Sequence, residues 1–498
     1  MQTPVFCVIT AGMMHFPSIT ILGLGPGDPR LLTRQVWELL GDIEEIYVRT
    51  QRHPAVGALP AHLRVFSFDY LYNRADSFEA VYRQIVDEVL RLAQRPQGVV
   101  YAVPGHPFVA EATTPAILRA AREEGLSVRV LEGISFIEPV LSALEIDPLP
   151  NLLISDALEI AASHVPQFPP HLPLLIAQLY SRQVAADVKL TLMEVYPHDH
   201  PVRLVHQAGT AAVKVEQLSL YEIDRSPWID WMTSLYVPSL PRETAFEPFQ
   251  EVVAHLRSPE GCPWDREQNH QTLKPFLLEE AYELVEAIDQ ENALAMQEEL
   301  GDLLLQVVLH AQIASEEGDF GMKEVLTGIH RKLVNRHPHV FGDLAVRDSS
   351  EVLRNWEKLK AEERRKNSEE PKGLLDGVPR ALPALSQAQE LQRRAARVGF
   401  DWPQIEGVLQ KVAEELHELL AAKGAKDQST EFGDILFSLV NLARWLKIDA
   451  ESALRQANQR FRQRFAYIEQ RVQEQGRNLA DLTLAEMDAL WGEAKQLE

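Results

Sequence analysis

The sequence predicts a multidomain protein, in which an α/β block is followed by two all-α helical bundle domains. Three observations support this: the length of 498 residues, the alternation of β-branched runs with helical stretches up to about residue 237, and an internal repeat in the helical remainder. At roughly 150 residues per domain the length corresponds to about three domains. We expect an N-terminal extension at 1–17, the α/β domain at 18–240, and helical domains at 241–370 and 371–498.

Composition and charge exclude several classes of protein. Asp and Glu number 72 against 49 Lys and Arg, a formal net charge of −23, so we expect no stable binding to nucleic acid. No apolar run approaches the roughly 18–20 residues that a membrane helix needs, and we expect no membrane partner. Only two cysteines are present, which favours a reducing cytoplasm over a disulfide framework. The first residues lack a basic start and a cleavage site, so no signal peptide is predicted.

The α/β block shows strands and helices in alternation. Strands are predicted at 18–25, 98–103, 126–133 and 172–180, with helices at 76–95 and 113–125. This order is typical of a mostly parallel sheet that is covered on both faces. The proline-rich segment 237–248 is predicted to be a linker.

The helical part repeats itself. The first copy, 277–288 followed by 298–312, matches the second copy, 412–423 followed by 430–444, and a polar stretch at 366–383 separates them. Such a repeat indicates two copies of one helical domain.

Each copy places acidic residues at equivalent positions. On a helical wheel, Glu415 lies at the edge of a core-facing stripe made of Leu409, Val412, Leu416 and Leu419, and Glu280 lies beside Leu277, Ala281, Leu284 and Ile288 in the same way. The spacing i, i+3 is repeated in four pairs, which are Glu280 and Glu283, Glu299 and Asp302, Glu415 and Glu418, and Glu431 and Asp434.

These pairs predict a metal site in each copy. Two antiparallel helices would aim four carboxylates into one cleft, where their repulsion favours a bound cation. Oxygen ligands alone favour Mg²⁺ or Mn²⁺. Any single glutamate could instead belong to a solvated face, but the repetition favours a site. Gly301 and Gly433, beside the acids, suggest a close approach of helices.

Basic residues follow each acidic pair of helices. The second copy has four arginines within ten residues (455, 460, 462 and 464), and the first aligns Lys332 with Arg460 and Arg336 with Arg464. Such cations would hold phosphate oxygens, although a solvated basic face is the simpler alternative.

These motifs resemble a known family. EExxE at 279–283 and 414–418, each followed by ExxD at 299–302 and 431–434, is the signature of the MazG nucleoside triphosphate pyrophosphohydrolases, and CPWDREQ at 262–268 fits the family's first domain. The resemblance implies Mg²⁺-dependent hydrolysis of nucleoside triphosphates to nucleoside monophosphates and diphosphate, by a homodimer.

The resemblance also implies roles for residues. Catalytic and metal-binding glutamates would be Glu415, Glu418, Glu280 and Glu283, with Glu431, Asp434, Glu299 and Asp302 as further metal ligands. Substrate would be bound by Lys411, Asn458, Arg460, Arg464 and Trp491, and in the first copy by Lys332 and Arg336. In the first copy Phe276 replaces the lysine and His330 the asparagine, so we expect the second copy to be the stronger catalyst. Which glutamate acts as base is left open.

Glycine-rich loops follow the predicted strands of the α/β block. GLGPGDP at 23–29 departs from the dinucleotide fingerprint and, alone, could be a plain βα turn. Together with 101–114 and 131–146 it resembles the tetrapyrrole (corrin/porphyrin) methylase family. That resemblance implies S-adenosylmethionine bound between two α/β lobes, near Gly23, Gly25, Pro26, Gly27, Gly105, His106 and Ser135.

His106 leaves the activity of this block open, because the family usually carries an aspartate there. The leading hypothesis is therefore a pyrophosphohydrolase with an attached methylase-like domain. Alternatives are methyl transfer to a tetrapyrrole as the main activity, or an N-terminal block that only dimerises or regulates.

Overall fold

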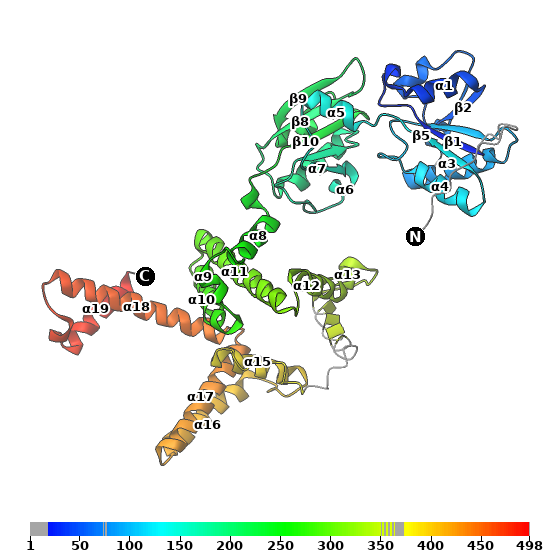
Figure 1. The fold of residues 1–498 in the computed structure, drawn as a ribbon. Coiled ribbons are helices and arrows are strands. Elements are labelled where there is room, and N and C mark those ends of the chain that lie inside the picture. The colour runs from blue at the N-terminus through cyan, green and yellow to red at the C-terminus, as the bar shows by residue number, and fades with distance from the viewer. Residues whose placement is uncertain are drawn as a thin grey trace. The chain divides into compact units, whose positions relative to one another are not determined.

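The computed structural model describes residues 18–72, 74, 77–349, 351–352, 355–356, 359–360, 363 and 373–497 (Figure 1). The predicted N-terminal extension, 1–17, lies outside the described residues, as does much of the polar stretch that begins at 366. The chain forms two compact units, one ending at Glu260 and the other beginning at Gly261. The first is α/β and the second is helical, as predicted. The domain boundaries at 240 and 370 stay predictions.

The first lobe of the α/β unit is a parallel sheet in the order β3-β2-β4-β1-β5. Its strands are β1 (Ile19–Gly23), β2 (Glu45–Val48), β3 (Arg64–Ser67), β4 (Val99–Val103) and β5 (Val128–Leu131). Helices α3 (Phe78–Ala93) and α4 (Thr113–Glu123) bury one face, with Ile21 and Tyr101 in that core. Helix α1 (Arg34–Asp42) buries the other face through Val36 and Leu40. The predicted coverage of both faces is confirmed here.

The second lobe corrects the prediction of a mostly parallel sheet. Its order is β6-β7-β10-β8-β9, and only β6 and β7 are parallel neighbours. The strands are β6 (Leu153–Asp156), β7 (Leu174–Ala177), β8 (Pro201–His206), β9 (Lys214–Ser219) and β10 (Thr233–Val237). The connection of seven residues from β8 to β9 is too short for a crossover, so these strands form an antiparallel hairpin. Helices α6 (Ala157–Ala161) and α7 (Arg182–Met193) cover one face, and α5 (Ile137–Leu144) packs on the other.

The predicted linker is shorter than expected. A 3₁₀ turn, η4 (Arg242–Thr244), precedes helix α8 (Phe246–Leu256), so helical structure begins inside 237–248.

The helical unit contains two hairpins with the same construction. The first pairs α10 (His270–Asp289) with α11 (Ala293–Glu317), and the second pairs α16 (Ile405–Ala421) with α17 (Ala425–Trp445). The other described helices are α9 (Pro263–Glu267), α12 (Met322–Arg336), α13 (Pro338–Phe341), α15 (Ala384–Arg397), α18 (Ala450–Glu474) and α19 (Leu484–Gln496).

Side-chain caps set the turns of the first hairpin. The Asn292 side chain accepts a hydrogen bond from the Ala295 amide and starts α11. Gly318, with φ +84°, ends that helix in a left-handed cap.

The predicted core stripe of the second copy is wrong for this chain. Leu409 and Leu416 are 48% and 50% exposed, and Ile288 in the first copy is also exposed. The reason is the way the hairpin packs: α16 packs against α17, and Val408 is the apolar side chain of α16 that is fully buried. The helix face beside Val408 is left without a cover in the described part of one chain.

Among the described residues, no helix combines the length and the apolar character needed to cross a membrane.

Candidate functional site

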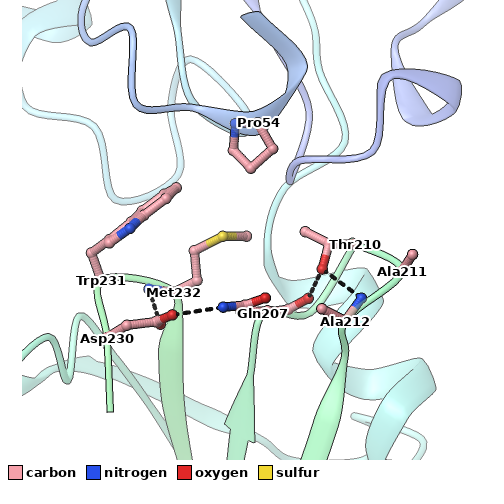
Figure 2. Close-up of a pocket in the computed structure, with 8 residues that line it drawn as sticks. All are labelled: Pro54, Gln207, Thr210, Ala211, Ala212, Asp230, Trp231 and Met232. Carbon is pink, nitrogen blue, oxygen red and sulfur yellow. Dashed lines mark hydrogen bonds between the residues drawn. The ribbon is translucent and has the colours of Figure 1, made fainter. Parts of the chain in front are cut away.

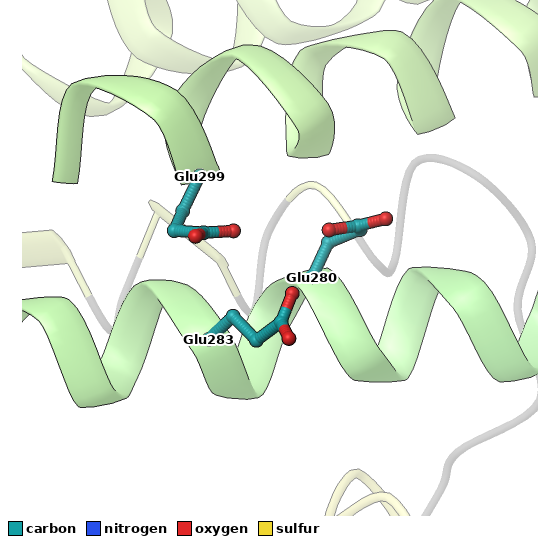
Figure 3. A group of neighbouring side chains, drawn as sticks. All are labelled: Glu280, Glu283 and Glu299. Atoms are coloured by element: carbon teal, nitrogen blue, oxygen red, sulfur yellow. The ribbon is translucent and has the colours of Figure 1, made fainter. Parts of the chain in front are cut away.

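The first helical hairpin brings three glutamates together. Glu280 and Glu283 project from α10 and Glu299 projects from α11, all toward the space between the two helices (Figure 3). One carboxylate oxygen of each lies within 4.8 Å of the others. The i, i+3 spacing on α10 puts two of them on one face, and the antiparallel turn brings the third across from it.

The second hairpin repeats the arrangement. Carboxylate oxygens of Glu415, Glu418 and Glu431 also lie within 4.8 Å of one another. Glu415 is only 5% exposed, which makes it one of the few buried carboxylates of the described chain. The two clusters are thus equivalent in position and in residue type, as the repeat predicts.

The aspartates of the predicted sets lie outside these groups of three but act on them electrostatically. Partial burial raises the pKa of Glu280, and the charges of Asp302 and of the neighbouring glutamates add to that effect. Burial likewise raises the pKa of Glu431, followed by the charges of Glu418 and Asp434. The pKa of Glu299 is raised for the same reasons. Each cluster is therefore an accumulation of negative charge.

Such a set of donors fits a hard divalent cation. Converging carboxylates whose pKa values are raised by burial and by mutual repulsion gain most from an added positive charge. Every donor in the two groups is a carboxylate oxygen, which suits Mg²⁺ or Mn²⁺ rather than a metal that prefers nitrogen or sulfur.

The two clusters differ at the position one helical turn before the first glutamate. Lys411 places its Nζ 2.8 Å from a Glu415 carboxylate oxygen and 3.1 Å from Glu414. Hydrogen bonds to Glu415 and Glu414 raise the pKa of Lys411, so this ammonium stays charged.

In the first copy the equivalent residue is Phe276. Its ring lies edge-on to Trp264, with ring centroids 6.2 Å apart, and both rings are partly exposed. Sequence reasoning missed this aromatic pair as part of a site. The alignment of the two copies could have revealed it, because Phe276 stands at the position of Lys411, beside the acids.

The nucleotide-handling residues predicted for the second copy are only partly brought together. On α18 and α19, the Arg464 guanidinium lies over the Trp491 ring at 5.3 Å, and Phe461 contacts the same ring. Asn458 and Arg460 are exposed on α18. Helix α18 packs chiefly against α19, whereas α16 packs against α17.

The predicted cations of the first copy lie on α12. Arg336 pairs with Glu363, with a shortest distance of 2.7 Å, and lies over the Trp356 ring. Lys332 is exposed on the same helix.

The predicted close approach at Gly301 and Gly433 is wrong within one chain. A methyl group added at either glycine would meet nothing within 4 Å.

In the α/β unit the predicted cofactor glycines pack against each other. A Cβ at Gly23 would come 2.4 Å from the Gly105 carbonyl oxygen and 2.8 Å from Gly133 Cα. Gly25 and Gly105 exchange backbone hydrogen bonds of 3.2 and 2.8 Å, and both have positive φ. Only glycine allows the three loops to meet this closely at the carboxyl ends of the strands.

The same loop also contacts the second lobe. A Cβ at Gly27 would come 2.8 Å from Thr210, and one at Gly209 would come 2.5 Å from Pro26. The Asp28 amide donates to the Gly209 carbonyl at 2.7 Å. The glycine-rich loop therefore joins the lobes through its backbone.

The other predicted cofactor residues have partners within the protein. The buried Ser135 donates to Glu138 and accepts from the Ile137 amide, which shapes the start of α5. The His106 ring nitrogen accepts from the Phe108 amide at 3.1 Å. Nearby, burial lowers the pKa of His53 to about 4, so that ring is neutral.

A cleft of about 330 Å³ lies between the two lobes of this unit (Figure 2). Pro54 forms one side, and Trp231 and Met232 face it from the second lobe, together with Gln207, Thr210, Ala211, Ala212 and Asp230. The Asp230 carboxylate accepts from the Gln207 side chain and the Met232 amide, which fixes that wall. None of the predicted cofactor residues lines this cleft, and sequence reasoning missed the second-lobe loops because the strands that hold them were not predicted.

The fold and the two clusters define the class of the protein. It belongs to the family in which a tetrapyrrole methylase domain is fused to a MazG nucleotide pyrophosphohydrolase region. The model of the tetrapyrrole (corrin/porphyrin) methylases matches residues 18–224. The model of the MazG nucleotide pyrophosphohydrolase domain matches residues 268–341, which contain the whole first hairpin.

One relative matches the chain over almost its whole length. The chain is 45% identical over 489 residues to the Bacillus subtilis protein YabN, which is described as uncharacterized. This match covers 96% of this chain and 99% of that protein. The chain is also 47% identical over 250 residues to the nucleoside triphosphate pyrophosphohydrolase/pyrophosphatase MazG of Thermotoga maritima. That match covers 50% of this chain and 95% of the relative. A solved cobalt precorrin-4 methyltransferase matches at 17% identity and a TM-score of 0.36, covering 44% of this chain and 94% of that chain.

Proposed function

We propose that the helical unit is a Mg²⁺-dependent nucleoside triphosphate pyrophosphohydrolase, which converts a nucleoside triphosphate and water to the nucleoside monophosphate and diphosphate. The observation that carries the proposal is the pair of carboxylate clusters, repeated on two helical hairpins. The relatives of this half of the chain carry that activity in their names, which supports the same reaction here. The small number of cysteines suits a cytoplasmic enzyme.

The clusters are proposed to hold the cation through eight acids. They are Glu280, Glu283, Glu299 and Asp302 in the first copy, and Glu415, Glu418, Glu431 and Asp434 in the second. A divalent cation held there would neutralise charge that develops on the phosphates and lower the pKa of the attacking water. One of the three clustered glutamates in each copy would accept the proton of that water.

The remaining residues are proposed to orient the nucleotide. Lys411, Arg460 and Arg464 would donate to phosphate oxygens, and Trp491 offers a ring face for the base. In the first copy Lys332 and Arg336 supply cations, and the exposed Trp264–Phe276 pair offers an aromatic surface one turn from Glu280.

We further propose that the active form is a homodimer. Helix α17 carries an outward apolar stripe, Phe432, Leu436 and Leu439, whose side chains are 54%, 42% and 44% exposed. Residues at this spacing share one helix face, which a soluble protein normally covers. A second copy of the hairpin would cover it, and could bring an α18 beside the carboxylates.

The direct test is an analysis of products. Full-length protein with Mg²⁺ and each nucleoside triphosphate in turn is expected to yield monophosphate and diphosphate in equal amounts, separated by anion-exchange chromatography. Release of orthophosphate with accumulation of nucleoside diphosphate would contradict the proposal, because it places the cleavage at the wrong phosphorus. No turnover with any triphosphate would also contradict it.

A second function is favoured by the cleft of the α/β unit. We propose that this cleft binds S-adenosylmethionine for methyl transfer, with a tetrapyrrole as one possible acceptor class, because it lies between two lobes and combines an indole ring, Trp231, with polar groups of Gln207 and Asp230. An adenine ring would stack on the indole.

Calorimetry with S-adenosylmethionine tests this second function. Trp231→Ala is expected to weaken binding about tenfold, because base–aromatic stacking contributes about 1–3 kcal/mol. Trp228→Ala is the matched control, since this tryptophan is equally exposed but does not line the cleft. Absence of binding by the unaltered protein would leave a regulatory or dimerising role for this unit.

A further inference from the structure

The two carboxylate clusters differ in their internal charge balance. In the second copy the Lys411 ammonium lies 2.8 Å from Glu415, the buried member of the cluster. In the first copy that position is Phe276, an uncharged ring that packs against Trp264. The three glutamates are otherwise equivalent in the two copies.

The lysine therefore satisfies part of the negative charge of Glu415 that a divalent cation would otherwise neutralise. A charge-assisted hydrogen bond to a buried carboxylate is among the stronger polar contacts. A cation that binds to Glu415 must compete with this contact, whereas a cation that binds to Glu280 has no such competitor from the equivalent position.

We propose that Lys411 is a resident counter-ion of the second cluster, which is exchanged when metal and nucleotide bind together. This inference rests on the proposed function. When the triphosphate arrives, the lysine leaves Glu415 for a phosphate oxygen, and the freed carboxylate binds the divalent cation. The lysine stem has four carbons with free rotation, and its side chain is 34% exposed, so the move requires no change of backbone.

Two consequences distinguish the copies. The first cluster, without a counter-ion, binds a divalent cation in the absence of nucleotide more tightly than the second. In the second copy, nucleotide and cation promote each other's binding, because each relieves the lysine contact that opposes the other. By linkage this coupling is reciprocal. The first copy lacks that source of coupling.

The test measures Mn²⁺ binding rather than turnover. Two backgrounds of the full-length chain isolate each cluster: Glu280→Gln, Glu283→Gln and Glu299→Gln leave only the second, and Glu415→Gln, Glu418→Gln and Glu431→Gln leave only the first. Isothermal titration with Mn²⁺ is then repeated with and without the α,β-methylene analogue of ATP. Circular dichroism checks the helix content of every variant.

The exchange predicts opposite effects of two reciprocal substitutions. Lys411→Met is expected to tighten Mn²⁺ binding to the second cluster roughly tenfold and to abolish most of the gain from the nucleotide analogue. Phe276→Lys is expected to weaken Mn²⁺ binding to the first cluster by a similar factor and to introduce coupling. Phe276→Leu, which adds no charge, is the matched control.

The outcomes separate this inference from the proposed function. Unchanged or weaker Mn²⁺ binding in Lys411→Met, with saturable binding still present, overturns the counter-ion role alone. Absence of saturable Mn²⁺ binding in both backgrounds overturns the metal site and the counter-ion together. If Lys411→Met loses helix content, the test rests on Phe276→Lys. Mn²⁺ binding to the first cluster that is not weakened in Phe276→Lys overturns the inference.

Discussion

Replacing Glu280 and Glu415 together by glutamine is expected to reduce diphosphate release at least about a thousandfold, because charge stabilisation at a reacting phosphorus is the main source of catalysis in such a site. Each glutamate is the first acid of its cluster, and each lies within 4.8 Å of two further carboxylates. Glutamine keeps the volume and removes the charge, so the hairpins should fold while their hold on the cation is lost.

The experiment compares diphosphate release by the double variant and by the two single variants. We expect Glu415→Gln to reduce the rate more than Glu280→Gln, since Lys411 lies beside the acids of the second copy and Phe276 takes that position in the first. The control changes two exposed glutamates of the same helices, Glu279→Gln with Glu406→Gln, and should leave the rate within about twofold. Persistent release by the double variant would defeat the assignment of the clusters.

Leu436→Glu is expected to convert a dimer of the full chain into a monomer, with a rise in the dissociation constant of at least about a thousandfold. Leu436 lies at the centre of the outward stripe of α17 and is 42% exposed in one chain. Burying a leucine stabilises a contact by about 1.5–3 kcal/mol, and a twofold axis doubles that loss, to which the buried charge adds.

Light scattering coupled to size-exclusion chromatography measures this effect as a halving of the mass. Thr430→Glu, which adds the same charge at an exposed position on the opposite side of the same helix, is the control and should stay dimeric. A variant that keeps the dimer mass would place the interface elsewhere. A monomeric unaltered protein would refute the homodimer itself.

The acidic positions were predictable because helical spacing alone puts i and i+3 on one face. Glu280 and Glu283 needed no knowledge of tertiary structure, and the antiparallel turn between α10 and α11 follows from their short connection. The repeat then carried the same prediction to Glu415 and Glu418. The apolar stripe of Leu409 and Leu416 was predicted by the same wheel, and yet it is exposed. A wheel states which residues share a face, and not what covers it.

The α/β unit shows a second limit of sequence reasoning. The parallel first lobe followed from β-branched runs between amphipathic helices, and the structure confirms it. Strands β8, β9 and β10 carry mixed polar and apolar residues and were missed, so the antiparallel half of the second sheet and the cleft beside Trp231 were missed with them. The glycine-rich loop is predicted to hold a cofactor, and that role stays a prediction; the structure adds that Gly23 and Gly27 lie close to the backbone and side chains of neighbouring loops.

The sequence by itself determined which acids cluster, because their spacing along one or two helices places them on one face. It also determined the repetition of the helical hairpin and the order of the predicted strands and helices. Only the tertiary structure decided that Lys411 forms an ion pair with a buried Glu415 while Phe276 packs against Trp264. The physical reason is that burial and charge pairing depend on residues distant in the chain, whose packing no local period encodes.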